Sequence, residues 1–181
     1  MIEIRQISTK DTELYVFMVE LMMEAFPPSE YRAISELRHF TDHNPRFKAN
    51  VVMVDNEPQG FLNYWDLGQF HFFEHLAVKQ QRRNGGIGRK VMQWIQNNFE
   101  RIIFEVEIPG STDMAARRVR FYEGMGYKLC EKDYAQPAYN GVGEPVPMKL
   151  MSYGDIDPDT EYDKIVDIMK KEVYGIQEND K

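Results

Sequence analysis

The segment QQRRNGGIGRK, residues 80–90, combines glycine with basic side chains in a pattern that suits phosphate chemistry. Five consecutive residues can aim backbone N–H groups outward just before a segment with helical periodicity: Asn84, Gly85, Gly86, Ile87 and Gly88. The N-terminus of a helix carries partial positive charge, and glycine lets an anion approach the backbone closely. Arg83 and Arg89 add cations. The pattern predicts a pyrophosphate cradle; the structural alternative is a glycine-rich turn with solvated arginines.

Two better-known phosphate motifs fit this segment less well. A Walker loop needs Lys and then Ser or Thr after its last glycine, whereas Gly88 is followed by Arg89-Lys90-Val91. In a dinucleotide fingerprint, Gly86 and Gly88 would be the first two glycines, and Glu105 or Glu107 would bind the ribose. Val91 then occupies the third glycine position, where a β-branched side chain would hold helix and strand apart.

Three side chains elsewhere can move protons. Tyr122 has an ordinary pKa of ~10, so its phenol is protonated at neutral pH and can donate to a leaving group. Glu74 and Glu107 lie in strand-like segments and can accept a proton, with a pKa raised by partial burial. The structural alternatives are a core tyrosine and two orienting carboxylates. No metal site is predicted, because His71 and His75 lack a third ligand. Cys130 is not predicted to be a nucleophile, because it has no basic neighbour immediately before it.

Apolar periodicity predicts the elements that position these groups. Strands are expected near 1–8, 47–55, 60–67, 69–78, 101–108, 127–134 and 145–152. Helices are expected from Thr9 or Asp11 to 25, after a Ser29 cap, over 87–99, from 111–113 to 123, and over 160–174 with Thr160 and Asp163 as a capping pair. Residues 55–59 read as a hairpin loop, and Asn140-Gly141 as a reverse turn.

This element order predicts an α/β (α+β mixed) fold. The strand–helix–strand unit over 70–108 implies a right-handed crossover between parallel strands, while the hairpins imply antiparallel neighbours. We therefore expect a mixed, mostly antiparallel sheet with a central parallel strand pair and helices on both faces. One domain is expected over 1–153, with a helical extension over 154–181 that is not a separate domain.

Composition narrows the class of partner. The chain has 181 residues and a formal net charge of −7, which argues against nucleic acid as the main partner. No segment approaches the ~20 apolar residues of a membrane span, so no membrane partner is expected. Cys130 is the single cysteine, which excludes an intramolecular disulfide and favours a reducing, cytoplasmic location.

A family resemblance follows from two motifs taken together. VKQQRRNGGIGRKVM resembles the acyl-CoA signature of the GNAT N-acetyltransferase superfamily, Arg/Gln-x-x-Gly-x-Gly/Ala, which residues 83–88 match. FYEGMGY, residues 121–127, resembles the segment that closes the next helix in that superfamily. The element order over about residues 1–152 is also similar. Two positions depart from the common pattern: Ala115 stands where many members have Asn, and Arg118 where a small residue is usual.

The resemblance implies an acetyltransferase that uses acetyl-CoA as its acetyl donor. It implies that the backbone of Leu76, Ala77 and Val78 binds the pantetheine arm, that the glycine loop binds the pyrophosphate, and that Tyr122 is the general acid. Glu74, Glu107 or a water molecule would be the general base. The expected reaction is direct transfer to a primary amine within a ternary complex; the alternative is a non-catalytic CoA-binding or interaction module.

The resemblance leaves the acceptor open, as a small-molecule or peptide amine. It implies that five residues border the acceptor cleft: Phe26, Tyr31, Tyr134, Gln136 and Tyr139. The C-terminal extension lies outside the resemblance. The apolar face of its helix can pack within the chain or across a homodimer.

Overall fold

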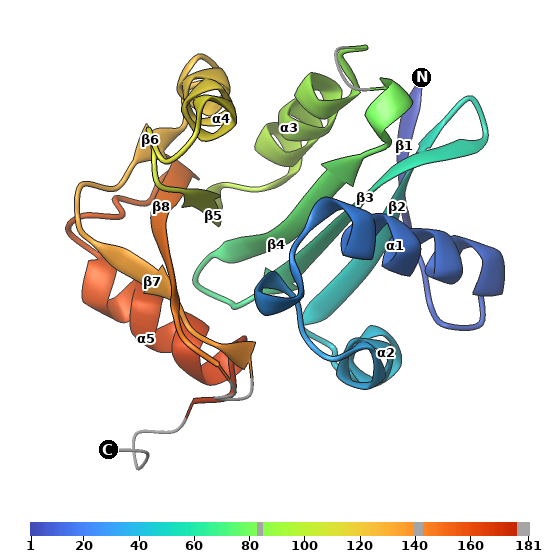
Figure 1. Cartoon of the computed structure of the whole chain (residues 1–181), viewed down its shortest axis with the longest axis horizontal. Helices are drawn as coiled ribbons and strands as arrows, with labels where there is room; N and C mark the ends of the chain where they lie inside the picture. The colour runs from blue at the N-terminus through green and yellow to red at the C-terminus, as the bar shows by residue number, and fades with distance from the viewer. Residues whose placement is uncertain (83–84, 140–142, 177–181) are drawn as a thin grey trace. The chain divides into compact units, whose positions relative to one another are not determined.

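The computed structural model describes residues 1–82, 85–139 and 143–176, and divides the chain into two compact units (Figure 1). Unit 1 comprises residues 1–66 and 73–99; unit 2 comprises residues 67–72 and those from 100 onward. The predicted turn at Asn140-Gly141 lies outside the described residues. Each unit has its own strands, with helices packed against them.

Unit 1 is built on strands β1 (Ile2–Gln6), β2 (Phe47–Val54), β3 (Glu57–Asp66) and residues 73–78 of β4 (His71–Val78), in that order across the sheet. The β1–β2 and β2–β3 pairings are antiparallel. Val54 pairs with Glu57, so the β2–β3 turn is only Asp55-Asn56, shorter than the predicted loop 55–59. Both turn residues have positive φ, +50° and +66°, as expected of a tight hairpin whose twist matches its strands.

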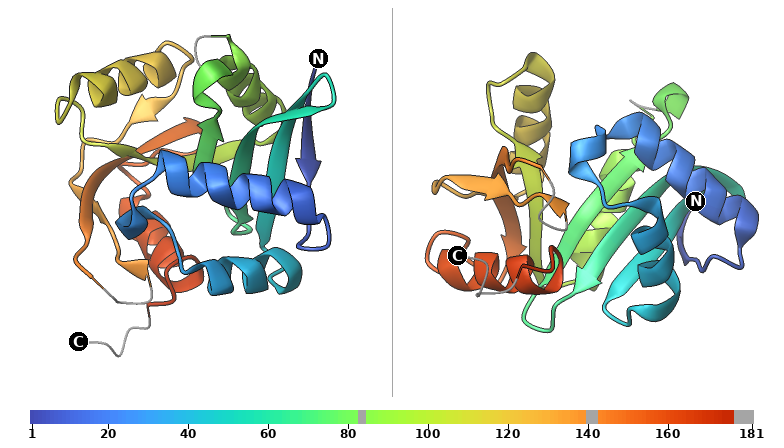
Figure 2. Two further views of the ribbon diagram at one scale, coloured as in Figure 1. Left: turned by 45° about the vertical axis from the view of Figure 1, so that its right-hand side comes forward. Right: turned by 60° about the horizontal axis from the view of Figure 1, so that its bottom comes forward.

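Aromatic contacts show how the helices of unit 1 cover both faces of these strands (Figure 2). The unit contains α1 (Thr12–Ala25), α2 (Ile34–His43) and α3 (Ile87–Asn98), with short 3-10 turns at Pro28–Glu30 and Gln80–Arg82. Phe40 of α2 lies edge-on to Trp65, with ring centroids 5.5 Å apart. The neighbouring Tyr64 points to the other face, where Phe99 at the end of α3 lies 5.2 Å away.

The prediction that Ser29 caps the second helix is wrong. Pro28–Glu30 form one 3-10 turn, the chain is extended at Tyr31, and α2 begins at Ile34. Two consecutive prolines fix φ at Pro27 and Pro28 and favour an extended residue before the second proline, which separates α2 from α1. The interposed segment carries Arg32.

Unit 2 contains β5 (Arg101–Glu107), β6 (Lys128–Leu129), β7 (Tyr134–Gln136) and β8 (Val146–Gly154). β8 pairs antiparallel with β5, and also with both β6 and β7. The single strand predicted over 127–134 is therefore wrong: two short strands replace it. Between them the Glu131 N–H donates to Asp159 Oδ1 at 2.8 Å, a bond that takes the place of a strand-ladder bond.

Two helices cover opposite faces of β5. On α4 (Asp113–Glu123), Tyr122 meets Phe104 with ring centroids 4.8 Å apart. The adjacent Glu105 points the other way, where it accepts a hydrogen bond from Tyr174, which follows α5 (Tyr162–Glu172). Adjacent strand residues face opposite sides, so β5 presents one side chain to each helix.

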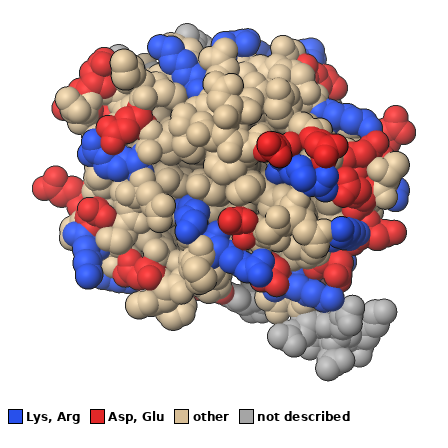
Figure 3. All heavy atoms as spheres, turned by 180° about the vertical axis from the view of Figure 1, so that it is seen from behind, with Lys and Arg blue, Asp and Glu red and all other residues tan. Residues whose placement is uncertain are grey.

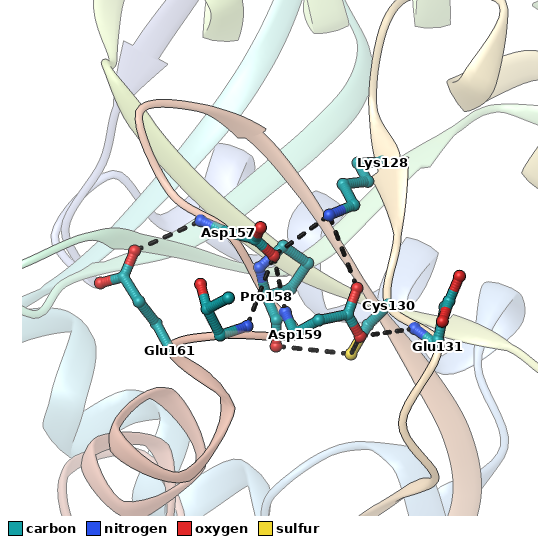
Figure 4. A network of polar contacts seen from close by, with 8 residues as sticks. Lys128, Cys130, Glu131, Asp157, Pro158, Asp159 and Glu161 are labelled. Atoms are coloured by element: carbon teal, nitrogen blue, oxygen red, sulfur yellow. Dashed lines mark hydrogen bonds and ion pairs between the residues drawn. The ribbon is translucent and has the colours of Figure 1, made fainter.

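The C-terminal extension is tied to unit 2 through a polar network (Figure 4). Lys128 Nζ lies 3.1 Å from Asp157 Oδ1, and Arg101 Nη2 lies 2.7 Å from Glu161 Oε2. The predicted capping pair is wrong, because α5 begins after Glu161 and has no side-chain cap. The acidic residue there bonds Arg101 instead. The domain boundaries proposed from the sequence stay a prediction.

Candidate active site

The end of β4 is brought close to β3 by a glycine. A Cβ at Gly60 would lie 2.6 Å from the Ala77 carbonyl oxygen, so only glycine allows this approach. The Lys79 N–H then donates to the Gln59 carbonyl oxygen at 2.8 Å. These contacts fix the backbone of Leu76, Ala77 and Val78, the segment expected to bind pantetheine. Gly60 carries no motif of its own, and the sequence analysis missed it.

The glycine loop meets α3 as predicted. Gly86 is the N-cap with φ +75°, a left-handed conformation that side chains other than glycine adopt at a cost. Ile87 is the first helical residue, and Lys90 N–H makes the first intrahelical bond, to the Gly86 carbonyl oxygen at 3.1 Å. The N–H groups before Lys90 therefore have no carbonyl acceptor within the helix.

The first turn of α3 also suits an anion. It contains no acidic residue, and Gly85 and Gly86 are exposed. A Cβ built on Gly86 or Gly88 meets no atom within 4 Å, so the space before the helix is open. Arg89 is exposed on the same turn. Arg83 and Asn84, also predicted to contact the cofactor, lie outside the described residues.

Glu74 is the centre of a buried ionic cluster in unit 1. Its Oε1 lies 2.5 Å from Arg32 Nη2, and its Oε2 accepts a hydrogen bond from Trp65 Nε1 at 3.0 Å. The side chains of Glu74 and Arg32 are only 1% and 2% exposed. The Arg32 guanidinium also lies over the rings of Phe40 and Trp65, at 4.8 and 5.3 Å from their centroids. Sequence reasoning missed Arg32, since 42 residues separate it from Glu74.

The pKa of Glu74 shifts in the direction opposite to the one expected from burial alone. Burial acts to raise the pKa of the carboxyl, but the charge of Arg32 and the Trp65 hydrogen bond hold it below its ordinary value. The expectation of a raised pKa at Glu74 is therefore wrong. A carboxylate with a lowered pKa and both oxygens engaged is a weak proton acceptor, better suited to orienting its neighbours.

His75 extends the cluster toward the segment between α1 and α2. Its Nε2 lies 2.7 Å from the Glu30 carbonyl oxygen, and its ring lies 4.8 Å from that of Phe26. Burial lowers the pKa of this imidazole despite the adjacent Glu74 carboxylate. With Arg32, these contacts fasten residues 26–32 to β4. The sequence had placed Phe26 and Tyr31 beside the acceptor.

Tyr122 lies on α4 in an aromatic cluster of unit 2. Its half-buried ring meets Phe104 at 4.8 Å and Phe121 at 5.4 Å, and its carbonyl oxygen accepts from the Tyr127 N–H at 3.1 Å. Burial raises the pKa of the phenol, against the opposing charge of Arg118. Among the described residues no hydrogen-bond acceptor occupies its hydroxyl. The group is thus protonated and available to donate.

Glu107 stands near α4 in a more open setting. Its Oε2 lies 2.6 Å from Arg118 Nη1, and its side chain is 41% exposed. Arg118 is the residue that departs from the usual small side chain, and the structure gives it this carboxylate as a partner. Ala115, the other departure, is buried and donates its N–H to the Thr112 cap at 3.0 Å.

Cys130 is buried and bonded. Its Sγ lies 3.1 Å from Asp159 Oδ1, among the residues drawn in Figure 4. Burial, together with the Asp159 hydrogen bond, raises the pKa of the thiol to about 11. A protonated, enclosed thiol is a poor nucleophile, in agreement with the sequence analysis.

Other classes of site find no support among the described residues. Within residues 1–82, 85–139 and 143–176, no three His, Cys, Asp or Glu side chains gather as metal ligands. None of the described helices combines the length and apolarity needed to cross a bilayer. On the face drawn in Figure 3, basic and acidic side chains are interspersed, and no basic patch dominates.

Known proteins resemble this chain in both sequence and fold. The profile of the acetyltransferase (GNAT) domain matches residues 46–129. A GNAT-family protein of Bacteroides thetaiotaomicron, assigned as an acetyltransferase, is 39% identical, with a TM-score of 0.92 over 97% of this chain and 99% of that one. A comparison with curated proteins found no match.

More distant structures share the fold alone. An aminoglycoside 6'-N-acetyltransferase complexed with coenzyme A is 20% identical, with a TM-score of 0.61 over 86% of this chain and 98% of the other. The aminoglycoside 6'-N-acetyltransferase of Enterococcus faecium is 18% identical, with a TM-score of 0.57 over 86% and 98%. The domain match and the Bacteroides thetaiotaomicron relative confirm the predicted mixed, mostly antiparallel fold, an acyltransferase class and acetyl-CoA, the donor of this family. The chain belongs to the GNAT family of acetyltransferases.

Proposed function

We propose that the protein transfers the acetyl group of acetyl-CoA to a primary amine by direct attack within a ternary complex. The observation that carries this proposal is the start of α3, where a left-handed Gly86 and a first turn without acidic residues follow β4. A pyrophosphate is the anion that such a helix start accommodates. The amine acceptor is a small molecule or a peptide.

The described residues fit acetyl-CoA at the donor end. Gly85, Gly86, Ile87 and Gly88 would surround the pyrophosphate, and Arg89 would neutralise part of its charge. Leu76 to Val78 would bond the pantetheine through backbone groups, and one of their N–H groups would stabilise the oxyanion. Asn84 and Arg83 keep their proposed place in the phosphate site.

The chemical step requires one donor and one acceptor of protons. The amine nitrogen attacks the thioester carbonyl, a C–N bond forms, and the C–S bond breaks as the tetrahedral intermediate collapses. We assign to Tyr122 the proton that the departing thiolate takes up, since its phenol is protonated and has no acceptor among the described residues.

The attacking amine must lose a proton. Arg32 and Trp65 already bond both oxygens of the Glu74 carboxylate, so we assign Glu74 a positioning role. Arg118 bonds one oxygen of the Glu107 carboxylate, whose side chain is 41% exposed, and we propose Glu107 as the base, acting directly or through a water molecule. 

Direct transfer is supported by the state of the sole cysteine. An acyl-enzyme route would need a reactive nucleophile, and the Cys130 thiol is buried with a pKa of about 11. A reducing compartment and a homodimer stay predictions from the sequence.

Initial-rate kinetics test the proposal. Released CoA is measured with a thiol-reactive dye while acetyl-CoA and a primary amine are varied independently. We expect intersecting double-reciprocal lines and an acetylated amine by mass spectrometry. Parallel lines with acetyl-protein would contradict direct transfer. CoA binding without turnover on a broad amine panel would favour the non-catalytic CoA-binding module.

A further inference from the structure

Two consecutive residues of β4 hold the segment between α1 and α2. Glu74 Oε1 lies 2.5 Å from Arg32 Nη2, in an ion pair whose side chains are both nearly fully buried. One residue further along, His75 Nε2 lies 2.7 Å from the Glu30 carbonyl oxygen. These contacts join positions 42 and 45 residues apart in the sequence. They therefore fix where the segment lies and not only its local shape.

The hydrogen bond at His75 has a defined direction. A carbonyl oxygen can only accept, so the Nε2 atom carries the proton and donates it to Glu30. The other contact of the imidazole is with the Phe26 ring, whose centroid lies 4.8 Å away at an interplanar angle of 68°. One buried side chain of β4 thus holds the segment at two points, a backbone carbonyl and an aromatic ring.

The order of residues along β4 places this attachment at one end of the proposed donor site. Residues 76–78 are assigned to the pantetheine arm, and the loop that follows β4 is assigned to the pyrophosphate. Because pantetheine connects the pyrophosphate to the thioester, it runs back along β4 from Val78 toward Leu76. The thioester then lies at the end nearest His75. The acceptor amine has to reach it there.

We propose that His75 is a positioning residue for the acceptor amine: it holds Phe26 and the Glu30 backbone so that residues 26–32 form one wall of the acceptor site. This inference rests on the proposed function, because it concerns the acceptor of that same reaction. His75 acts through the segment and is assigned no proton transfer. The Arg32–Glu74 ion pair fixes the end of the segment nearer α2.

Substitutions at position 75 separate the hydrogen bond from the shape of the side chain. His75→Phe keeps a planar ring beside Phe26 but offers no donor to Glu30. His75→Gln gives up the ring and restores an N–H donor at about the reach of Nε2. Phe99→Leu is the matched control in unit 1, because the Phe99 ring contacts Tyr64 on the other face of β3, with centroids 5.2 Å apart.

Steady-state kinetics use three amine probes: phenethylamine, 1,5-diaminopentane and a peptide with a free N-terminal alanine. With the probe that the wild-type protein acetylates best, we expect His75→Phe to raise the amine KM by about 10-fold, as expected of one lost hydrogen bond. The kcat and the CoA affinity measured by calorimetry should stay within about threefold of wild type. His75→Gln should return the amine KM to within about threefold, and Phe99→Leu should leave it unchanged.

Hydrogen exchange followed by mass spectrometry checks the cause. Residues 26–32 should exchange faster in His75→Phe than in wild type, and at the wild-type rate in Phe99→Leu. Faster exchange with an unchanged amine KM would show an attachment that does not serve the acceptor, and would overturn the proposal. A parallel loss of CoA affinity would also overturn it, because the substitution would then disturb β4 as a whole.

Failure of the proposed function has a different signature. A wild-type protein that binds no CoA, or that acetylates none of the three probes, would defeat acetyl transfer itself. An unchanged amine KM in His75→Phe would leave transfer intact and defeat only the positioning role.

A milder variant covers the case in which His75→Phe does not fold. Phe26→Leu replaces a half-buried ring and keeps the hydrogen bond between His75 and Glu30. We expect the amine KM to rise by about threefold or more while CoA affinity is retained. An amine KM equal to that of wild type would contradict the proposed wall.

Discussion

Glu74 and Glu105 each accept hydrogen bonds from two side chains of the described residues, and these donors differ in charge. Glu74 accepts from a guanidinium and an indole, and the side chains of Glu74 and Arg32 are almost fully buried. Glu105 accepts from two phenols and is half-buried. A carboxylate paired with arginine holds a buried charge of the opposite sign, whereas the two phenols, of Tyr134 and Tyr174, orient a carboxylate through neutral hydrogen bonds. The same residue type thus forms a buried ion pair in unit 1 and joins β7 and the end of α5 to β5 in unit 2.

The largest expected effect is the difference between Glu74→Gln and Glu105→Gln in the free energy of unfolding. Glu74→Gln removes the nearer carboxylate from the buried Arg32 guanidinium, whose ion pair with Glu36 is longer at 3.9 Å, and we expect a loss of about 3–5 kcal/mol in the free energy of unfolding. Glu105→Gln keeps an acceptor oxygen for both tyrosines and should cost about 1 kcal/mol. Urea unfolding of the two variants measures both values. Equal losses would remove the distinction between the two carboxylates.

Substitutions can distinguish the contribution of the Arg32–Glu74 ion pair to stability from that of the surrounding packing. Arg32→Met alone should destabilise the protein about as strongly as Glu74→Gln, because it strands the opposite charge. Combining Arg32→Met with Glu74→Leu should recover most of that loss, since neither charge then remains. Arg5→Met, which breaks an exposed pair with Glu3, is the matched control and should leave unfolding nearly unchanged. A double variant as unstable as the sum of its parts would argue against an ionic role.

A smaller effect, on the activation free energy of turnover, is expected at the Tyr122 hydroxyl. This hydroxyl has no acceptor among the described residues, whereas the Tyr174 hydroxyl donates to Glu105. Tyr122→Phe removes the assigned acid, so turnover should fall by about 100-fold while CoA affinity is retained. Tyr127→Phe, in the same aromatic cluster, is the control and should reduce turnover far less. Unchanged turnover in Tyr122→Phe would leave the acid unassigned.

The smallest expected effect is a change with pH in the difference in unfolding free energy between wild type and Glu74→Gln. The folded-state pKa of Glu74 is lowered, so its contribution is present above the unfolded value of about 4.3 and is lost as pH falls through the folded value. The stability gap between wild type and Glu74→Gln should therefore narrow below about pH 4. Urea titrations at pH 7 and in acid check this. A gap that widens in acid would contradict a lowered pKa.

Sequence patterns predicted the local parts of this molecule and missed the long-range ones. The glycine loop, β4 and α3 adjoin one another in sequence, so spacing alone placed Gly86 at a helix start. Arg32 and Glu74 meet across 42 residues, and Glu105 and Tyr174 across 69. Those contacts depend on register and on helix docking, which local periodicity does not encode.

Local signals also failed where tertiary contacts competed with them. Ser29 has the chemistry of a helix cap, but two prolines place it in a 3-10 turn. Thr160 and Asp163 resemble a capping pair, yet Glu161 occupies the cap position and bonds Arg101. The family resemblance ended near residue 152, so it carried no information about Tyr174.

Calorimetric titration with CoA tests the central claim most directly. Gly86→Glu places a bulky acid at the left-handed start of α3, and Gly68→Glu is the matched control, because Gly68 is exposed with φ +77° against +75° for Gly86. We predict that wild type and Gly68→Glu bind CoA and that Gly86→Glu loses at least about 100-fold in affinity. Equal affinities in all three proteins would contradict a phosphate site at the start of α3.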